Sequence, residues 1–326
     1  MSMTTSPLLD VRDLKVEFLR DGNAVAPVDS VSFTLQANQT LGLLGESGCG
    51  KSVTALSILR LFPMASKARL SGSVRFRGQD LLQADEASLR ALRGKDIAMI
   101  FQEPMTSLNP LHRIGDQLGE MLRMHTSLDR KQITEQSIAM LKRVGLPRAE
   151  QLVDDYPHSL SGGMRQRVMI AMALLCHPGV LICDEPTTAL DVTIQAQILD
   201  LMRDLKEQQG TAILMITHDL GVVAEMCERV VVMYAGQVVE ESSVRDLFDA
   251  PAHPYTTALM RARPTLAATP GQPLLAIPGM VPPPGSVNSG CRFAARCPKV
   301  DAHCRAQMPE LTEVAPGHLA RCWHPG

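Results

Sequence analysis

The stretch 45–52 (GESGCGKS) constrains the fold of this chain more than any other feature. It has the phosphate-loop pattern: a glycine, four further residues, and then Gly-Lys-Ser. Residues 39–44 before it predict a short apolar strand, and 52–61 after it carry apolar residues at helical spacing. A strand, a glycine-rich turn and a helix start form an anion site, because backbone N–H groups converge there and the helix dipole adds positive charge. The pattern predicts that the chain binds a nucleoside triphosphate.

The residue types of the loop suit this chemistry. Glycines let the backbone approach phosphate oxygens, Lys51 would reach the β- and γ-phosphates, and the Ser52 hydroxyl would ligate Mg²⁺. The Cys49 thiol, at a helix start beside Lys51, is expected to have a lowered pKa and to be reactive. The expected nucleotide contacts are Gly45, Glu46, Ser47, Gly48, Cys49, Gly50, Lys51, Ser52 and Val53.

Composition narrows the function classes. The 326 residues suffice for one large domain or two unequal ones, and 45% hydrophobic with 20% charged residues is typical of a soluble globular protein. A net charge of −2 and 3% aromatic residues argue against nucleic-acid binding. The start of the chain lacks a signal-peptide pattern, and no apolar run is long enough to span a membrane. Any membrane role is therefore expected to be peripheral.

Apolar periodicity predicts an α/β fold with a parallel core and a helical insertion at about 103–176. Strands are predicted at 8–18, 28–36, 71–78, 96–101, 180–183, 212–216 and, as a pair, 229–240. Helices are predicted at 84–93, 112–125, 130–144, 162–176, 193–208 and 220–227. We assign 1–263 to the nucleotide-binding domain and 264–326 to a proline-rich linker with a cysteine-rich extension.

Polar residues follow two of the buried strands. Asp184 and Glu185 come at the end of 180–183, where Asp184 would hold the Mg²⁺ shell and Glu185 would activate water. His218 ends the strand at 212–217, at the carboxyl edge where ligands of α/β sheets bind, so it would face the γ-phosphate.

A second phosphate-binding end is predicted at 160–164 (LSGGM). Ser161 would cap the following helix, and Gly162 and Gly163 leave the helix N-terminus bare. One nucleotide does not need two such ends. The pattern therefore favours a head-to-tail dimer, in which this helix end covers the γ-phosphate bound by the other subunit.

In this order and spacing, the motifs resemble those of ATP-binding-cassette (ABC) ATPases over residues 8–250. Gln102 is similar to the Q-loop glutamine, 160–164 to the LSGGQ signature, 184–185 to the Walker B pair, 189–191 to the D-loop, and His218 to the switch histidine. The resemblance implies a P-loop NTPase with a RecA-like core, an antiparallel β subdomain and a helical subdomain, which hydrolyses ATP with Mg²⁺.

The resemblance also implies roles for three further residues. Gln102 would contribute to the Mg²⁺ site and to catalysis, Phe18 would stack on adenine, and Asp191 would lie in the nucleotide site. Met164 departs from the signature, where the family has Gln, and Phe18 lacks the hydroxyl that the usual aromatic carries.

The C-terminal part is similar to the oligopeptide/dipeptide (and nickel) importer branch. The similarity rests on 247–256, Ile277-Pro278-Gly279, Gly290-Cys291, Arg296-Cys297-Pro298 and Gly317-His318. It implies an ATPase subunit on the cytoplasmic face of the membrane that powers peptide uptake. Its partners would be two permeases, a second ATPase subunit forming a heterodimer, and an external peptide-binding protein.

Other functions are left as alternatives. The first is an importer of nickel or another small solute. The second, a soluble ABC ATPase acting on nucleic acid or the ribosome, is disfavoured because no long heptad segment lies between Lys51 and Ser161.

Four of the eight cysteines lie in the tail with the spacing C-x5-C-x6-C-x17-C. Four thiolates in a short polar segment could form a closed metal site. The branch resemblance favours a [4Fe–4S] cluster on Cys291, Cys297, Cys304 and Cys322. Structural zinc, with His303, His318 or His324 as substitute ligands, and four unligated thiols are the alternatives.

Overall fold

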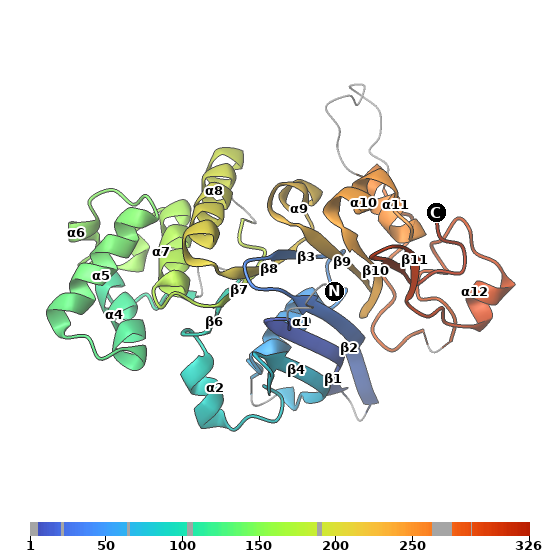
Figure 1. Cartoon of the computed structure of the whole chain (residues 1–326), viewed down its shortest axis with the longest axis horizontal. Coiled ribbons are helices and arrows are strands. Elements are labelled where there is room, and N and C mark those ends of the chain that lie inside the picture. The colour runs from blue at the N-terminus through green and yellow to red at the C-terminus, as the bar shows by residue number, and fades with distance from the viewer. Residues whose placement is uncertain are drawn as a thin grey trace. The chain divides into compact units, whose positions relative to one another are not determined.

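The computed structural model describes residues 6–20, 23–63, 66–102, 107–187, 191–262, 276–287 and 289–326. The chain divides into two compact units, drawn in Figure 1. The first comprises Met1–Leu35, Thr40–Gln83 and Ile216–Gly326, and the second comprises Gln36–Gln39 and Ala84–Met215.

The first unit contains an antiparallel sheet that matches the predicted N-terminal strands. Its strands are β1 (Leu9–Arg20), β2 (Asn23–Leu35), β4 (Arg69–Phe76) and β5 (Gln79–Asp80), in the order β2-β1-β4-β5. Alternating apolar residues of β1, including Leu9 and Val11, are fully buried, as the period of two predicts.

A second sheet in this unit runs β11-β12-β10-β9-β3. The strands are β3 (Thr40–Leu44), β9 (Arg229–Tyr234), β10 (Gln237–Ser243), β11 (Thr312–Ala315) and β12 (His318–Ala320). The β3–β9 pair is parallel and the other pairs are antiparallel. The helices of the unit are α1 (Lys51–Ile58), α9 (Leu220–Met226), α10 (Val244–Asp249), α11 (Pro254–Arg261) and α12 (Ala302–Ala306).

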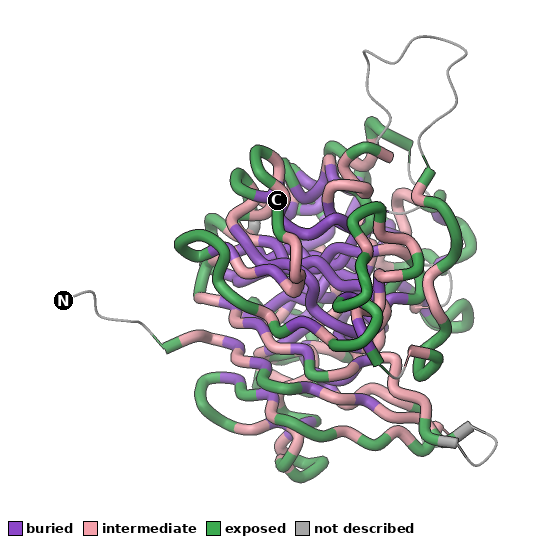
Figure 2. The backbone as a smooth tube through the Cα atoms, turned by 90° about the vertical axis from the view of Figure 1, so that its right-hand side faces the viewer, coloured by how far each residue is buried: buried purple, intermediate pink, exposed green. Residues whose placement is uncertain are grey.

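The second unit carries strands β8 (Ala212–Thr217), β7 (Val180–Asp184) and β6 (Ile97–Ile100) in that order, with β6 and β7 parallel. The last two residues of β8 are counted with the first unit. The helical segments are α2 (Glu86–Leu92), α4 (Ile114–His125), α5 (Arg130–Arg143), α6 (Ala149–Leu152), η2 (Pro157–Ser159), α7 (Gly162–Leu174) and α8 (Val192–Gln209). The predicted parallel core and helical insertion are confirmed. Strands β7 and β8 are buried along their whole length, and Figure 2 shows the burial of the backbone residue by residue.

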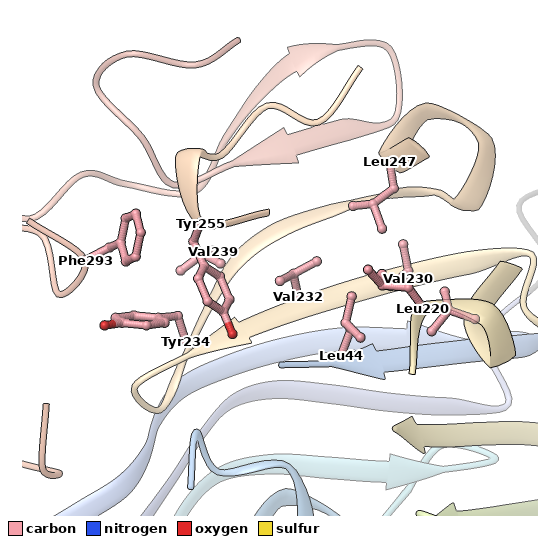
Figure 3. Packing of buried hydrophobic residues seen from close by; sticks show 10 residues of the cluster. Leu44, Leu220, Val230, Val232, Tyr234, Val239, Leu247, Tyr255 and Phe293 are labelled. Atoms are coloured by element: carbon pink, nitrogen blue, oxygen red, sulfur yellow. The ribbon is translucent and has the colours of Figure 1, made fainter. Parts of the chain in front are cut away.

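The C-terminal extension shares the core of the first unit. Its strand β12 pairs with β10, and Phe293 is 1% exposed within a cluster that includes Tyr234 and Tyr255 (Figure 3). Ring centroids lie 5.2 Å apart for Tyr234–Phe293 and 5.5 Å apart for Tyr255–Phe293. Ile277 and Val281, which the sequence places in the linker, pack against the same cluster. Part of the proline-rich stretch is therefore anchored by apolar contacts.

Candidate nucleotide-binding site

The phosphate loop follows the fully buried strand β3 and leads into α1, as the sequence predicts. Two of its glycines are required by space. A Cβ at Gly45 would lie 2.4 Å from the Met233 carbonyl oxygen, and one at Gly50 would lie 2.5 Å from that of Pro27. Gly50 also has φ 108°, a left-handed conformation that disfavours side chains. Only glycine fits at these two positions, where the loop packs against neighbouring backbone.

Lys51 is the first residue of α1 and its side chain turns back along the loop. It is 5% exposed, and its ammonium donates to the carbonyl oxygens of Gly45 at 2.7 Å and Glu46 at 3.1 Å. A buried ammonium held by backbone carbonyls in a loop of this shape is placed to meet phosphate oxygens.

The prediction of a reactive Cys49 is wrong. Its side chain is fully buried, and burial raises the pKa of the Cys49 thiol despite the opposing effect of Lys51. The Sγ atom occupies the space beside Gly45, where a Cβ would lie 2.6 Å from it. Cys49 is therefore a packing residue of the loop, because desolvation outweighs the helix start and the neighbouring ammonium.

Phe18 lies on β1 in the same unit. Its ring makes a T-shaped contact with the Phe62 ring, with centroids 5.6 Å apart and an interplanar angle of 82°. The ring is half-buried, which leaves part of its surface exposed. Stacking of Phe18 on adenine stays a prediction.

In the second unit, two predicted motifs meet at the end of β7. Asp184 is 4% exposed, and the Gln102 side-chain amide donates to the Glu185 carboxylate at 3.0 Å. Glu185 has φ 50°, a left-handed conformation that costs energy for a non-glycine residue and is common at functional sites. The structure therefore pairs the Q-loop glutamine with the predicted general base.

The sequence reasoning missed Gln166. This residue of α7 is 3% exposed, and its side-chain amide donates to the Pro186 carbonyl oxygen, one residue after Glu185. The helix that carries the signature is thus joined to the turn that carries the base. A signal was available, since Gln166 shares the face of its helix with the apolar residues Ile170 and Ala173.

The signature lies where it was predicted. The Ser161 hydroxyl accepts a hydrogen bond from the Met164 N–H at 3.3 Å and caps α7. Gly162 is exposed, and a Cβ there would meet nothing within 4 Å. The helix N-terminus is therefore bare, as expected for a phosphate-binding end. Asp191 caps α8 through the Ile194 N–H at 2.9 Å, whereas the rest of the D-loop lies outside the described residues.

His218 directly follows β8 and is exposed. The next residue, Asp219, caps α9 by accepting from the Gly221 N–H at 2.7 Å and donates its own N–H to the Thr217 hydroxyl. Two local hydrogen bonds thus fix the turn that presents His218 at the carboxyl end of the strand, as predicted.

The predicted site residues are divided between the units. Phe18, the phosphate loop and His218 belong to the first unit, and Gln102, 161–163, 184–185 and 191 belong to the second. Within each unit the residues occupy the strand ends and helix starts that their motifs predict.

The four cysteines of the extension line one small pocket, which His253 and Phe293 also line. Burial, together with the charges of the other three cysteines, raises the pKa of Cys291 to about 11. Burial likewise raises the pKa of Cys304 and Cys322, which also feel neighbouring thiols. None of the four forms a disulfide bond.

The three histidines proposed as substitute ligands have other partners. His318 meets Glu240 at 2.7 Å, His324 meets Asp301 at 2.8 Å, and the His303 ring lies 4.2 Å from the Trp323 ring. Asp301, Cys304 and His324 do bring three ligand atoms within 4.8 Å of one another.

Comparison with known families decides the classification. A model described as ABC transporter matches residues 28–188, and one described as oligopeptide/dipeptide transporter, C-terminal region, matches 239–304. The y4tR protein of Sinorhizobium fredii, whose name describes an ATP-binding protein of a peptide ABC transporter, is 51% identical over 99% of this chain and 98% of its own. The chain belongs to the ATP-binding proteins of oligopeptide/dipeptide ABC transporters. It is an ABC transport ATPase.

Further relatives support the family and the fold. The oligopeptide transport ATP-binding protein AppD of Bacillus subtilis is 48% identical, over 98% of this chain and 97% of its own. The ABC cassette MJ0796 matches with a TM-score of 0.65 at 24% identity, over 73% of this chain and 99% of its own. The cbiO1 protein of Clostridium perfringens matches with a TM-score of 0.62 at 26% identity, over 75% and 91% of the two chains. The predicted ABC nucleotide-binding fold is confirmed. Among the described helices, none is long and apolar enough to cross a membrane.

Proposed function

We propose that this chain is the ATP-hydrolysing subunit of a binding-protein-dependent importer that takes up di- and oligopeptides. The observation that carries the proposal is the oligopeptide/dipeptide region at 239–304, on the same chain as a complete ABC ATPase motif set. Relatives similar over nearly the whole chain are named for peptide or oligopeptide transport. Nickel chelates and other small solutes remain the alternative cargo, because solute choice lies in the permeases and the binding protein.

The phosphate loop would bind the nucleotide. Its N–H groups and the Lys51 ammonium would hold the phosphates, and Phe18 would stack on the base. Ser52, Gln102 and Asp184 would hold Mg²⁺, and their hydroxyl, amide and carboxylate oxygens are the donor types that this ion takes. When bound, the ion neutralises charge on the phosphates.

Glu185 would act as the general base on the attacking water, with the Gln102 amide orienting its carboxylate through the 3.0 Å hydrogen bond. His218 would assist at the γ-phosphate, and Ser161, with the bare N–H groups at Gly162 and Gly163, would contact the nucleotide held by the paired cassette.

The variant Glu185→Gln tests this assignment. It should bind ATP normally while hydrolysis falls by a factor of roughly 10²–10⁴, the usual contribution of a general base. Glu207→Gln, on the exposed face of α8, is the matched control and should hydrolyse ATP like the wild type. Normal turnover in Glu185→Gln would remove Glu185 from the mechanism.

The expected assembly contains two membrane permeases, a paralogous second ATPase and an external peptide-binding protein, with this chain peripheral on the cytoplasmic face. Affinity purification from native membranes in mild detergent, followed by mass spectrometry, tests it. Co-purification of permeases and a second cassette supports the importer, and the binding protein can then be screened with peptides and nickel. Recovery only with ribosomes or nucleic acid would refute it.

We propose that the four tail cysteines hold a structural [4Fe–4S] cluster. The charges of the other three thiols act on Cys291, and the four cysteines together line one pocket. A tetrahedral zinc site with Zn–S bonds of about 2.3 Å brings its sulfurs to about 3.8 Å from one another. No three of these sulfur atoms, all in the described part of the chain, lie within 4.8 Å of one another. The thiols are thus not gathered as tightly as a tetrahedral zinc site requires, and the resemblance to the importer branch favours the cluster.

Anaerobic purification followed by iron, sulfide and zinc analysis tests the cluster. About four irons and four sulfides per chain are expected, and Cys297→Ser should lower both. Cys176→Ser, a half-buried cysteine of the second unit, is the control and should leave the iron content unchanged. Stoichiometric zinc, or no metal, would exclude the cluster.

A further inference from the structure

An ion pair connects the C-terminal extension to the phosphate loop. The guanidinium of Arg296 meets both carboxylate oxygens of Glu46, at 2.7 and 3.1 Å, although the residues are 250 positions apart in the sequence. Glu46 is the second residue of the phosphate loop, and both residues belong to the first unit. The fork-to-fork geometry is the strongest form of such a pair and fixes direction as well as distance.

Arg296 is held in place from every side. Its side chain is 5% exposed, and beyond Glu46 it donates to the carbonyl oxygens of Pro278 at 2.8 Å and Ile277 at 3.2 Å, and to the Tyr234 hydroxyl at 3.4 Å. The hydrogen bonds thus number five, which is the number of N–H donors of a guanidinium. The extension therefore presents Arg296 as a rigid group rather than a flexible surface charge.

The loop side of the contact is equally ordered. The Glu46 N–H donates to the hydroxyl of the fully buried Tyr255 at 2.8 Å, while its carbonyl oxygen accepts from Lys51. The backbone and the side chain of Glu46 are thus each held, and the Lys51 ammonium depends on the orientation of this residue.

Glu46 poses an electrostatic problem that this pair solves. A carboxylate on a loop that wraps a triphosphate lies within about a Debye length of its charges and repels them. We propose that Arg296 is a positioning residue of the nucleotide site, which cancels the Glu46 charge and fixes the loop for ATP binding. The proposal rests on the assignment of nucleotide binding to this loop, and it makes the extension part of the ATP site.

Four full-length variants test the proposal by titration with a fluorescent ATP analogue: Arg296→Gln, Arg296→Lys, Glu46→Gln and the double variant Arg296→Gln/Glu46→Gln. Arg296→Gln should weaken ATP binding roughly tenfold, and ADP binding less, because the unpaired carboxylate repels the more highly charged ligand more. The loss should shrink at high salt. Arg296→Lys should recover part of the affinity, since it keeps the charge but not the fork. The double variant should return to within about twofold of Glu46→Gln.

Arg292→Gln is the matched control. Arg292 lies in the same extension and also ties it to the sheets of the first unit, through Asp29 of β2 and the Ala235 carbonyl oxygen after β9, and these partners lie outside the phosphate loop. Its ATP affinity should equal that of the wild type. Equal loss in Arg292→Gln, or a double variant as weak as Arg296→Gln, would overturn the proposal in favour of general loosening. A wild-type chain that binds no ATP would instead refute nucleotide binding itself.

Discussion

Replacing Glu240 by alanine should release the C-terminal extension from the sheet. Glu240 lies on β10, is completely buried, and accepts three hydrogen bonds. They come from the N–H groups of Ala252 and His253 at 2.7 and 2.8 Å, just before α11, and from the His318 ring of β12 at 2.7 Å. One carboxylate therefore joins β10 to a helix start and to the strand of the extension.

The expected cost follows from these three bonds. Alanine leaves three buried groups without their acceptor, and at upwards of about 1 kcal/mol for each unsatisfied buried donor the expected loss is roughly 3–5 kcal/mol. Glu240→Gln keeps one acceptor oxygen, and its NH₂ group faces a donor, so we expect roughly half of that loss. Asp249→Ala is the matched control, because this acid is largely exposed and its pair with Arg245 contributes no more than about 0.5 kcal/mol.

The single tryptophan of the chain makes the assay specific. Trp323 lies in the extension, where its indole N–H donates to the Gln307 carbonyl oxygen at 3.1 Å. Its fluorescence in urea therefore reports unfolding of this region, and trypsin digestion reports its release. A loss below about 1 kcal/mol in Glu240→Ala, with unchanged proteolysis, would show that the carboxylate does not hold the extension.

Three further predictions concern other groups. Phe293→Ala should lower the free energy of unfolding, read from the same Trp323 fluorescence, by roughly 3–5 kcal/mol, because the Phe293 ring is buried among aromatic rings. Met280→Ala, at an exposed position, should change it by no more than about 0.5 kcal/mol. Iodoacetamide should alkylate the buried Cys49 roughly a hundredfold more slowly in the folded chain than in urea. Peptide mass spectrometry measures the two rates, and equal rates would contradict the burial of Cys49. Burial, together with nearby Lys95, lowers the pKa of His125 in the folded chain. As the pH drops below 6.5, the unfolded chain therefore takes up a proton on this histidine before the folded chain does, and the free energy of unfolding should fall. His125→Gln should flatten that decline in urea unfolding curves, and an unchanged slope would contradict it.

The sequence predicted the nucleotide-binding elements well because each has a strong local signal. The apolar runs at 180–183 and 212–216 are β7 and β8, and the polar residues after them lie at the strand ends as expected. Ser161 caps its helix because cap, glycines and apolar period all agree at that point. Where local signals agree, tertiary packing only selects what the chain already prefers.

The extension could not be predicted in the same way. Its strands β11 and β12 and its helix α12 are short, and they lie among prolines and polar residues without a clear period. Phe293 is buried only because aromatic rings of β9 and α11 surround it. At Cys49 a clear local signal was misleading. Its neighbours in the sequence suggested a reactive thiol, whereas its neighbours in space bury it.

Three independent contacts argue that the extension and the nucleotide site form one structural unit. Strand β12 continues the sheet through β10, Phe293 completes the aromatic cluster, and Arg296 meets the phosphate loop. These contacts differ in kind, being backbone hydrogen bonds, apolar packing and a charge pair, so no single substitution removes all three. Arg296 directly precedes Cys297, so the segment that reaches the loop is the same segment that would carry a metal ligand. The cysteine-rich tail is therefore part of the structural unit that holds the phosphate loop, and not an appendage beyond it.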